Sequence, residues 1–272
     1  MLALVRIALA VTSALPSLPR PLELRYGRWT MLRSLLHKFH LRPDRDAKRL
    51  QNVLDCHYGH AATRRQRACV NRNGEPIPWY TYPAIEYLSQ LDHGDSHVFE
   101  FGSGNSTLFW GRRAKSVVSV ENDPDWSREV AARVGRAPIE LRLVENLDDY
   151  AATIRKADGP FDLIVVDGRR RYSCAREALS RLRPGGLIVL DNADWYPNTT
   201  AMLRAAGLIQ VDMSGFGPIN AYTWTTSLFL DREFRPRPLA GRLPATPTGG
   251  LIDYSDDDEE PAERQQRIAR SA

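Results

Sequence analysis

The alternation of short apolar runs with helical segments between residues 97 and 231 is the feature that most constrains the fold of this chain. The predicted strands are 98–101, 116–120, 139–144, 161–167, 187–191, 208–213 and 225–230. Strands that alternate with helices in this way predict an α/β fold, with a mostly parallel sheet and helices on both of its faces. The last two strands leave no room for a clear helix, so we expect them to form an antiparallel hairpin.

Two predicted helices have clear end signals. The first begins near Pro83, which suits the first helical turn, with Thr81 as a possible cap before it. The second covers 173–182, and the Arg-Pro-Gly-Gly run at 183–186 is expected to stop it.

A glycine turn follows the first predicted strand, and each of the first two predicted strands carries a carboxylate. Gly102 and Gly104 follow the first strand, Glu100 stands within that strand, and Glu121 ends the second strand 21 positions later. That spacing is about one strand–helix–strand step. A nucleoside cofactor needs a backbone that it can approach closely and an acid that binds its ribose hydroxyls.

The turn lacks the third glycine of a dinucleotide site, because Asn105, Ser106 and Thr107 follow Gly104. A lone Gly-x-Gly is weak evidence for any ligand. Together with Glu100, Glu121 and the terminal hairpin, it favours S-adenosylmethionine, which carries a ribose but no phosphate. A nucleotide (NAD)-dependent oxidoreductase is the alternative enzyme, and a non-catalytic cofactor-binding protein with the same fold is a further alternative.

At these motifs the chain resembles the class I S-adenosylmethionine-dependent methyltransferases. The matching segments are the Glu-x-Gly-x-Gly motif from Glu100, Glu121, the strand at 161–167 and the segment 182–191. The resemblance implies a Rossmann-like seven-stranded sheet with an antiparallel last strand, and a ribose contact by Glu121. The residues that it assigns to the cofactor are Glu100, Gly102, Gly104, Asn105, Ser106, Glu121, Asn146 and Asp167.

The reaction needs a group that activates the methyl acceptor, and all six histidines lie at or before position 97. A base would therefore be a carboxylate, an upstream residue or a metal-bound acceptor. Asp167 and Asp191 are the candidate catalytic residues, and Asp167, Asp191 and Asn192 offer oxygen ligands that suit Mg²⁺. This pattern is similar to the metal sites of catechol and macrolide-sugar O-methyltransferases. Three arginines at 169–171 depart from it, because cations beside a dication repel it. The alternative to a metal-binding role is that Asp191 and Asn192 only shape a turn.

The acceptor is less well defined than the cofactor. The arginines at 169–171 suit an anionic group on the acceptor or, equally, a solvated helix start. Aromatic residues at 79, 80, 82, 195 and 196 and the loop 215–218 are candidate pocket walls, although any single aromatic is ordinarily core. We expect O-methylation of a small molecule or a sugar-containing acceptor.

Composition limits the partners and the compartment. The net charge is +4, and the basic residues are scattered, so a nucleic-acid partner is not expected. Three widely spaced cysteines predict reduced thiols and a cytoplasmic protein. The apolar stretch 2–18 contains Arg6 and ends in prolines, which argues against a membrane span.

The chain divides into three predicted parts. Residues 1–75 are an N-terminal extension that is partly helical, with an amphipathic pattern over 29–39. Residues 76–235 are the cofactor-binding domain with its aromatic-rich lead-in helix. Residues 236–272 carry Pro, Gly and an acidic run at 256–260, and are expected to be a disordered tail.

Overall fold

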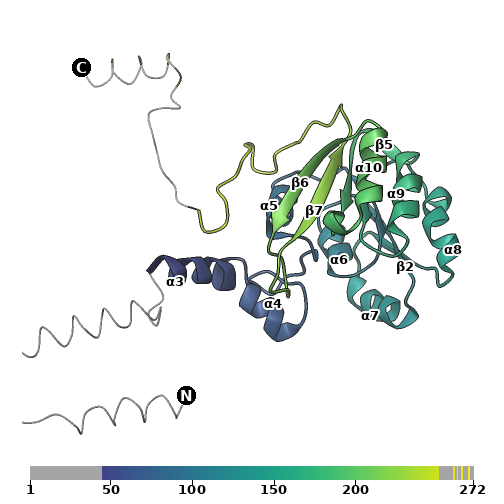
Figure 1. Ribbon diagram of the computed structural model, residues 1–272, viewed down its shortest axis with the longest axis horizontal. Helices are drawn as coiled ribbons and strands as arrows, with labels where there is room; N and C mark the ends of the chain where they lie inside the picture. Colours follow the sequence, from purple (N-terminus) through teal and green to yellow (C-terminus); the bar gives the residue numbers. More distant parts are fainter. Residues whose placement is uncertain (1–44, 251–259, 261, 263–264, 266–268, 270–272) are drawn as a thin grey trace, which may run out of the picture. The chain divides into compact units, whose positions relative to one another are not determined.

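The computed structural model of the protein describes residues 45–250, 260, 262, 265 and 269 (Figure 1). The apolar stretch 2–18, the predicted helix over 29–39 and most of the acidic run at 256–260 lie outside these residues. Two compact units divide at residue 51, and α3 (Arg45–Asn52) crosses that division. The unit from Gln51 onward contains all the strands described below, so residues 51–75 belong to the same unit as the sheet. The predicted boundaries at 76 and 236 stay predictions.

A seven-stranded sheet forms the centre of this unit, as predicted. Its strands are β1 (His97–Phe101), β2 (Ser116–Glu121), β3 (Ile139–Leu143), β4 (Phe161–Val166), β5 (Leu182–Leu190), β6 (Ile209–Gly215) and β7 (Trp224–Leu230). Their order in the sheet is β3-β2-β1-β4-β5-β7-β6. β7 is antiparallel to both of its neighbours, whereas β1 to β5 pair in parallel. The predicted α/β class and terminal hairpin are therefore confirmed.

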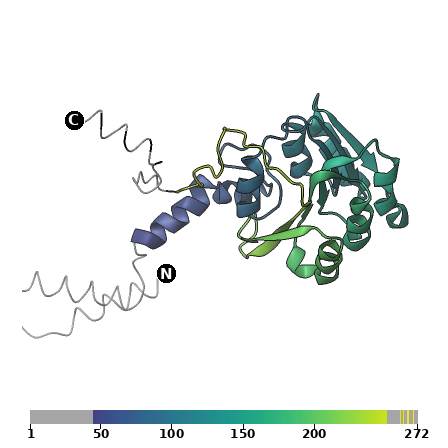
Figure 2. The ribbon, with the colours of Figure 1, turned by 90° about the horizontal axis from the view of Figure 1, so that it is seen from above.

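Helices cover both faces of the sheet (Figures 1 and 2). The helical segments are η1 (Val53–His57), α4 (His60–Gln66), α5 (Tyr82–Ser89), α6 (Asn105–Gly111), α7 (Pro124–Val134), α8 (Leu147–Tyr150), η2 (Ala151–Lys156), α9 (Arg171–Leu179), η3 (Ala193–Trp195) and α10 (Pro197–Ala205). Buried residues of α5 and α6 form a core with one face, and those of η2, α9 and α10 form a core with the other. No helix in the described part of the chain is long and apolar enough to span a membrane.

Side chains of the central strands point alternately to the two faces of the sheet and so contribute to both cores. In β4, Leu163 and Val165 pack on the α5–α6 side, whereas Ile164 and Val166 pack on the α9–α10 side. Successive side chains of a strand point to opposite faces, so a central strand with both faces covered is apolar at every position.

β5 begins earlier than predicted. It starts at Leu182, so the Arg-Pro-Gly-Gly run at 183–186 lies inside the strand, and α9 has already ended at Leu179. The register of β4 and β5 shifts between Phe161 and Leu163, which accommodates the irregular start. The Gly185 N–H donates to Asp231 Oδ1 at 2.9 Å, so a side chain supports this stretch in place of a regular ladder.

The lead-in helix α5 begins at Tyr82, with Pro83 in its first turn as predicted. Thr81 precedes it, but its hydroxyl does not cap the helix. Instead, Thr81 Oγ1 donates to the backbone oxygen of Met213 at 2.7 Å, and this bond ties the helix start to β6.

Candidate functional site

One cavity of about 730 Å³ lies at the carboxyl ends of the parallel strands. Its walls come from the turns after β1, β2, β4 and β5, from residues 66–69, and from the loop between β6 and β7. Ligands of open α/β sheets bind at this edge. The sequence-predicted site residues that line it are Gly102, Gly104, Asn105, Ser106, Glu121, Asp167, Asp191 and Asn192. Glu100 and Asn146 are not among its lining residues.

Gly102 allows two loops to touch. It has φ of 95°, and a Cβ added to it would lie 2.8 Å from both the N and the Cα of Gly168, in the turn after β4. The backbone of the glycine turn therefore packs directly on the backbone of the β4 turn. Both positive φ and this contact require glycine at position 102.

Glu100 is fully buried beneath the glycine turn. Its Oε2 accepts hydrogen bonds from Thr107 Oγ1 at 2.5 Å and from Ser119 Oγ at 2.7 Å. Thr107 Oγ1 also accepts the Gly104 N–H at 2.9 Å. Glu100 thus supports the turn from below instead of reaching the cavity. Burial raises the pKa of Glu100 to about 7, and no described residue bonds to its Oε1.

Glu121 accepts four hydrogen bonds at the end of β2. Its Oε2 accepts the N–H of Ser103 at 3.0 Å and the hydroxyl of Ser103 at 2.9 Å. Its Oε1 accepts the N–H groups of Asn122 at 2.7 Å and Asp123 at 3.0 Å. A carboxylate offers about four lone-pair sites, so these bonds use them all. A ribose hydroxyl would have to replace one donor, and the Ser103 hydroxyl is the one that can rotate away.

Residues 66–69, which the sequence placed in the N-terminal extension, form part of the cavity wall. Asn105 connects them to the glycine turn, because its Nδ2 donates to the backbone oxygen of Cys69 at 2.5 Å. Arg133 of α7 donates to Asn105 Oδ1 at 2.7 Å. Asn105 therefore holds three segments together, a role that its place in the motif does not indicate.

Trp126 lies beside the glycine turn, where the sequence predicted no site residue. Its Nε1 donates to the backbone oxygen of Ser103 at 2.8 Å, and its ring approaches the position that a Cβ on Gly104 would take. Asn146, which the resemblance assigns to the cofactor, is exposed and caps α8 by accepting the Asp148 N–H at 3.1 Å. The cavity therefore meets the first turn of α7, not that of α8.

The Arg171 guanidinium lies among the three side chains that were predicted to bind a metal ion. Its Nη2 donates to Asp167 Oδ1 at 2.9 Å, and its Nη1 donates to Asn192 Oδ1 at 3.0 Å and to the backbone oxygen of Asp191. Its Nε donates to the backbone oxygen of Gly168 at 3.1 Å. Arg171 thereby joins the turn after β4 to the turn after β5.

These contacts do not fit a divalent cation. Asp167 Oδ1 and Asn192 Oδ1, two of the oxygens that would coordinate Mg²⁺, accept guanidinium N–H groups instead, and the guanidinium repels a dication. Among the described residues, no group of three His, Cys, Asp or Glu side chains is placed to hold a metal ion. The structure therefore gives the predicted magnesium site no support. The reason is that Arg171, one of the three arginines at 169–171, donates hydrogen bonds to the turns after both β4 and β5.

Asp191 lies at the end of β5 and is 3% exposed. Its Oδ1 accepts hydrogen bonds from Trp224 Nε1 at 3.0 Å and from Thr226 Oγ1 at 2.5 Å, whereas no described side chain donates to its Oδ2. Burial, and then the neighbouring Asp167 carboxylate, raise the pKa of Asp191. Burial also raises the pKa of Asp167, and Arg171 partly offsets that effect.

Strained backbone gathers around the cavity. The described non-glycine residues with positive φ are Arg67, Arg170, Asn192 and Ile219. All of these except Arg170 line the cavity. Left-handed backbone is especially unfavourable for a β-branched residue such as Ile219, and such strain concentrates at functional sites.

The aromatic residues that the sequence proposed as walls divide into two groups. Trp79, Trp195 and Tyr196 line the cavity, as does Trp224 from β7. The other two, Tyr80 and Tyr82, are buried in the α5–α6 core. Sequence alone does not separate these groups, because both kinds occur in the same aromatic-rich run.

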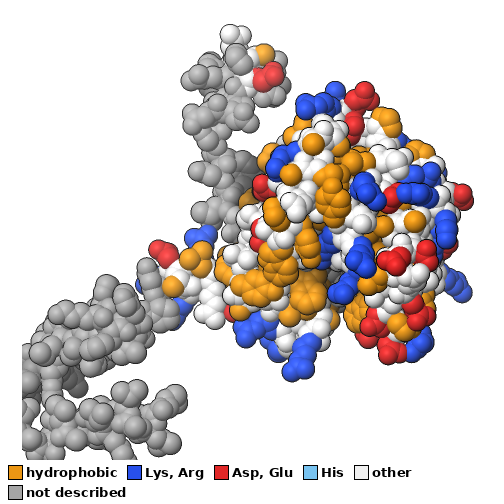
Figure 3. Space-filling model, turned by 45° about the vertical axis from the view of Figure 1, so that its right-hand side comes forward, with side chains coloured by type: hydrophobic (Ala, Val, Ile, Leu, Met, Phe, Trp, Pro, Cys, Tyr) orange, Lys and Arg blue, Asp and Glu red, His pale blue; other side chains and the backbone are white. Residues whose placement is uncertain are grey.

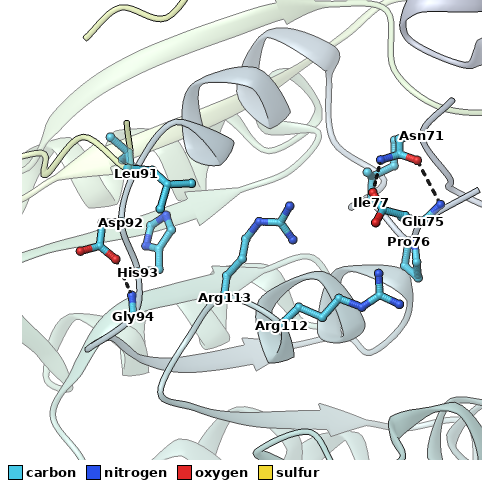
Figure 4. A pocket seen from close by; sticks show the side chains of 11 residues that line it. Asn71, Glu75, Pro76, Ile77, Leu91, Asp92, His93, Gly94, Arg112 and Arg113 are labelled. Carbon is cyan, nitrogen blue, oxygen red and sulfur yellow. Dashed lines mark hydrogen bonds between the residues drawn. The ribbon is translucent and has the colours of Figure 1, made fainter. Parts of the chain in front are cut away.

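A second cavity, of about 450 Å³, lies near the start of β1, away from the glycine turn (Figure 4). Arg112 and Arg113 line it together with Glu75 and Asp92. Both acids are engaged locally, since Glu75 accepts from Asn71 at 2.8 Å and Asp92 accepts the Gly94 N–H at 2.9 Å. None of the predicted site residues lines this cavity.

Residues 99–193, from β1 to η3, match the family model described as a methyltransferase domain. These residues are similar to a methyltransferase domain. The match starts at the strand before the glycine turn and ends just after Asp191 and Asn192. It therefore includes every turn that contributes a predicted carboxylate to the cavity.

Solved structures with similar folds show low identity to this chain. Cofactor-bound Rv0187 from MTB is 21% identical with a TM-score of 0.47, over 80% of this chain and 100% of that chain. SMU.1697c from Streptococcus mutans, a putative methyltransferase in complex with SAH, is 16% identical with a TM-score of 0.41, over 53% and 94%. An rRNA methylase from Streptococcus thermophilus is 19% identical with a TM-score of 0.40, over 55% and 95%. These values are too low to transfer a substrate to this chain.

Proposed function

We propose that this protein is an S-adenosylmethionine-dependent methyltransferase that acts on an oxygen atom of a small molecule or a sugar-containing acceptor. The observation that carries the proposal is that the glycine turn, Glu121 and Asp191 line one cavity. When bound, S-adenosylmethionine supplies an electrophilic methyl group on a sulfonium. The cavity volume of about 730 Å³ is within the ordinary range for small-ligand sites.

The donor half of the proposed site is the turn between β1 and α6. Backbone groups of Gly102 and Gly104 would contact the amino-acid part of the cofactor, with Asn105 and Ser106 beside them. Glu121 would bind the ribose by exchanging the Ser103 hydroxyl for a sugar hydroxyl. We assign the adenosine to the space beside Trp126, instead of to Asn146. Glu100 acts through the turn, without touching the cofactor.

Asp191 is the proposed general base. Its Oδ1 is held by Trp224 and Thr226, which leaves Oδ2 for the proton of an acceptor hydroxyl. A base with a raised pKa accepts a proton more readily than an ordinary carboxylate does. As the acceptor oxygen would form its bond to the methyl carbon, the sulfur–methyl bond would break and release S-adenosylhomocysteine, and the hydroxyl proton would pass to Asp191.

Asp167 has a different proposed role. Its Oδ1 is bonded to Arg171, so it is less suited to proton transfer than Asp191 is. A fixed carboxylate next to the glycine turn would stabilise the positive charge of a sulfonium. Arg171 would then be a positioning residue that holds both acids in place.

The acceptor class rests on the cavity rim. Arg67 and Arg169 line the cavity at its exposed edge and favour an acceptor with an anionic group. On the face that Figure 3 draws, Lys and Arg side chains alternate with Asp and Glu, without one basic stripe. We therefore keep a small acceptor ahead of a nucleic acid. The cytoplasmic location stays a prediction from the unpaired cysteines.

The experiment is a screen of phenols, catechols and sugars that reads release of S-adenosylhomocysteine, followed by identification of the methylated atom. Asp191→Asn should lower turnover by about 10²- to 10⁴-fold, while Asp125→Asn, at an exposed position, should not. Wild-type turnover should rise with pH through a range above the ordinary carboxyl pKa, because Asp191 must lose its proton to act. Full turnover by Asp191→Asn would refute the base, and methylation confined to nitrogen would refute O-methylation.

A further inference from the structure

An open groove adjoins the cavity on the side of η3 and α10. Its lining includes Tyr172, Trp195, Tyr196, Pro197, Met202 and Ala205. Trp195 and Tyr196 line both the groove and the cavity, so the two hollows adjoin at these side chains. Within the described residues, no charged side chain lines the groove.

Large apolar surface is left uncovered in this groove. Trp195 is 56% exposed and Tyr172 is 46% exposed. An isolated exposed aromatic is ordinary, but adjoining exposed aromatics beside an active-site cavity mark a binding surface. Each would gain stability if an apolar group covered it.

Trp195 stands on a well-supported turn. Asn192, at the start of η3, adopts φ of 50°, and the Trp195 N–H donates to its backbone oxygen at 2.8 Å. Asp194 Oδ1 accepts the Thr225 N–H at 3.0 Å, which ties η3 to β7. The strained backbone and the bond from Thr225 fix the position of η3, whose Trp195 side chain is 56% exposed.

We infer that the methyl acceptor has two parts: a hydroxyl-bearing ring that lies in the cavity near Asp191, and an uncharged apolar tail that crosses Trp195 into the groove. This inference rests on the proposed function, because the reacting hydroxyl is placed by Asp191. The occupant follows from the adjoining cavity and from a lining of aromatic, proline and methionine side chains. Arg67 and Arg169 lie on the rim of the cavity, outside the groove.

A series of 4-alkylphenols, from phenol to 4-octylphenol, tests the tail directly. The full chain is saturated with S-adenosylhomocysteine, and the dissociation constant of each phenol is measured by calorimetry below its aggregation limit. Affinity should rise up to about fourfold for each methylene that the groove covers, and then level off. Affinity that does not depend on tail length would overturn the inference.

Two neighbouring alanines provide a matched pair of variants. Ala205 and Ala206 are both exposed at the end of α10, but only Ala205 is among the groove residues. Ala205→Asp should remove most of the dependence on tail length, because a charge next to an apolar tail must be desolvated. Ala206→Asp should keep that dependence. An equal loss in both variants, or in neither, would contradict the groove.

Trp195→Ala separates this inference from the proposed function. The substitution should lower the affinity for 4-octylphenol by at least about tenfold and the affinity for phenol much less. The affinity for S-adenosylhomocysteine should stay unchanged. Phe216→Ala is the control, since Phe216 is 44% exposed and lines neither hollow. If S-adenosylhomocysteine fails to bind the wild type, the proposed function fails. If it binds and tail length has no effect, the groove inference alone fails.

Discussion

The four acids predicted for the site differ most in what donates to each of them. Glu100 receives two hydroxyls, Glu121 receives three backbone N–H groups and a hydroxyl, Asp191 receives an indole and a hydroxyl, and Asp167 receives the Arg171 guanidinium. The same functional group therefore serves as a support, a proposed ribose ligand, a proposed base and an ion-pair partner. Sequence spacing predicted where these acids lie along the strands, but it does not contain their partners, which come from other elements.

The contacts of Arg171 predict that neither the stability of the protein nor its cofactor binding depends on a metal ion. A chelator or added Mg²⁺ should leave the wild-type melting temperature and its affinity for S-adenosylhomocysteine unchanged. Arg171→Gln should destabilise the fold by about 3 to 5 kcal/mol, because Asp167 loses its partner in a buried site. Arg170→Gln is the control: its pair with Asp148 is exposed at 3.6 Å and should contribute less than about 1 kcal/mol. A melting temperature that falls with the chelator would refute this prediction.

Glu100 predicts a pH-dependent stability. Its pKa is raised by burial from 4.5 to about 7, so the folded chain holds the proton more tightly than the unfolded chain. Stability should therefore fall by about 3 kcal/mol as the pH rises across that interval, at 1.36 kcal/mol per pKa unit. Glu100→Gln should lose this part of the slope while keeping an oxygen for Thr107 and Ser119. Urea unfolding at about pH 5 and about pH 8 measures the difference, and identical slopes for the two proteins would contradict the assignment.

At the scale of elements, strands were predicted better than the segments between them. The apolar runs of β1, β2, β4 and β7 are dictated by burial, so their periodicity is visible in the sequence. The start of β5 was missed because Pro and Gly ordinarily end a helix, whereas here a register shift accommodates them. The turns after β1, β4 and β5 were predicted in position, but their packing on one another was not.

The glycine turn predicts different outcomes for its two glycines. Gly102→Ala should lower the free energy of unfolding by about 1 to 3 kcal/mol, because its Cβ would meet Gly168 and its φ is positive. Gly104→Ala should cost less than about 1 kcal/mol, since the nearest neighbour of its Cβ would be Trp126 at 3.6 Å. Gly104→Ala should instead lower the affinity for S-adenosylhomocysteine, because the added methyl group fills space assigned to the adenosine. Chemical unfolding and calorimetry separate the two effects, and equal destabilisation by both variants would contradict this packing.

At the scale of the whole molecule, the sequence predicted the class of the sheet, its terminal hairpin and most of the residues of the glycine turn that line the cavity. It missed residues 66–69, because their contribution depends on the hydrogen bond between Asn105 and Cys69, 36 positions apart. Trp126 was also missed, although an aromatic residue in the first turn after Asp123 was a readable signal. Contacts of this kind join segments that share no local pattern, so a motif search along the chain does not find them.

Calorimetric titration with S-adenosylmethionine tests the central claim most directly. The full chain should bind one equivalent, S-adenosylhomocysteine should compete, and NAD should give no heat. Glu121→Gln should weaken binding by roughly 10- to 100-fold, as expected for the loss of a charged hydrogen-bond acceptor. Glu140→Gln, on the exposed side of β3, should bind as the wild type does. No heat with either S-adenosylmethionine or S-adenosylhomocysteine would contradict the account.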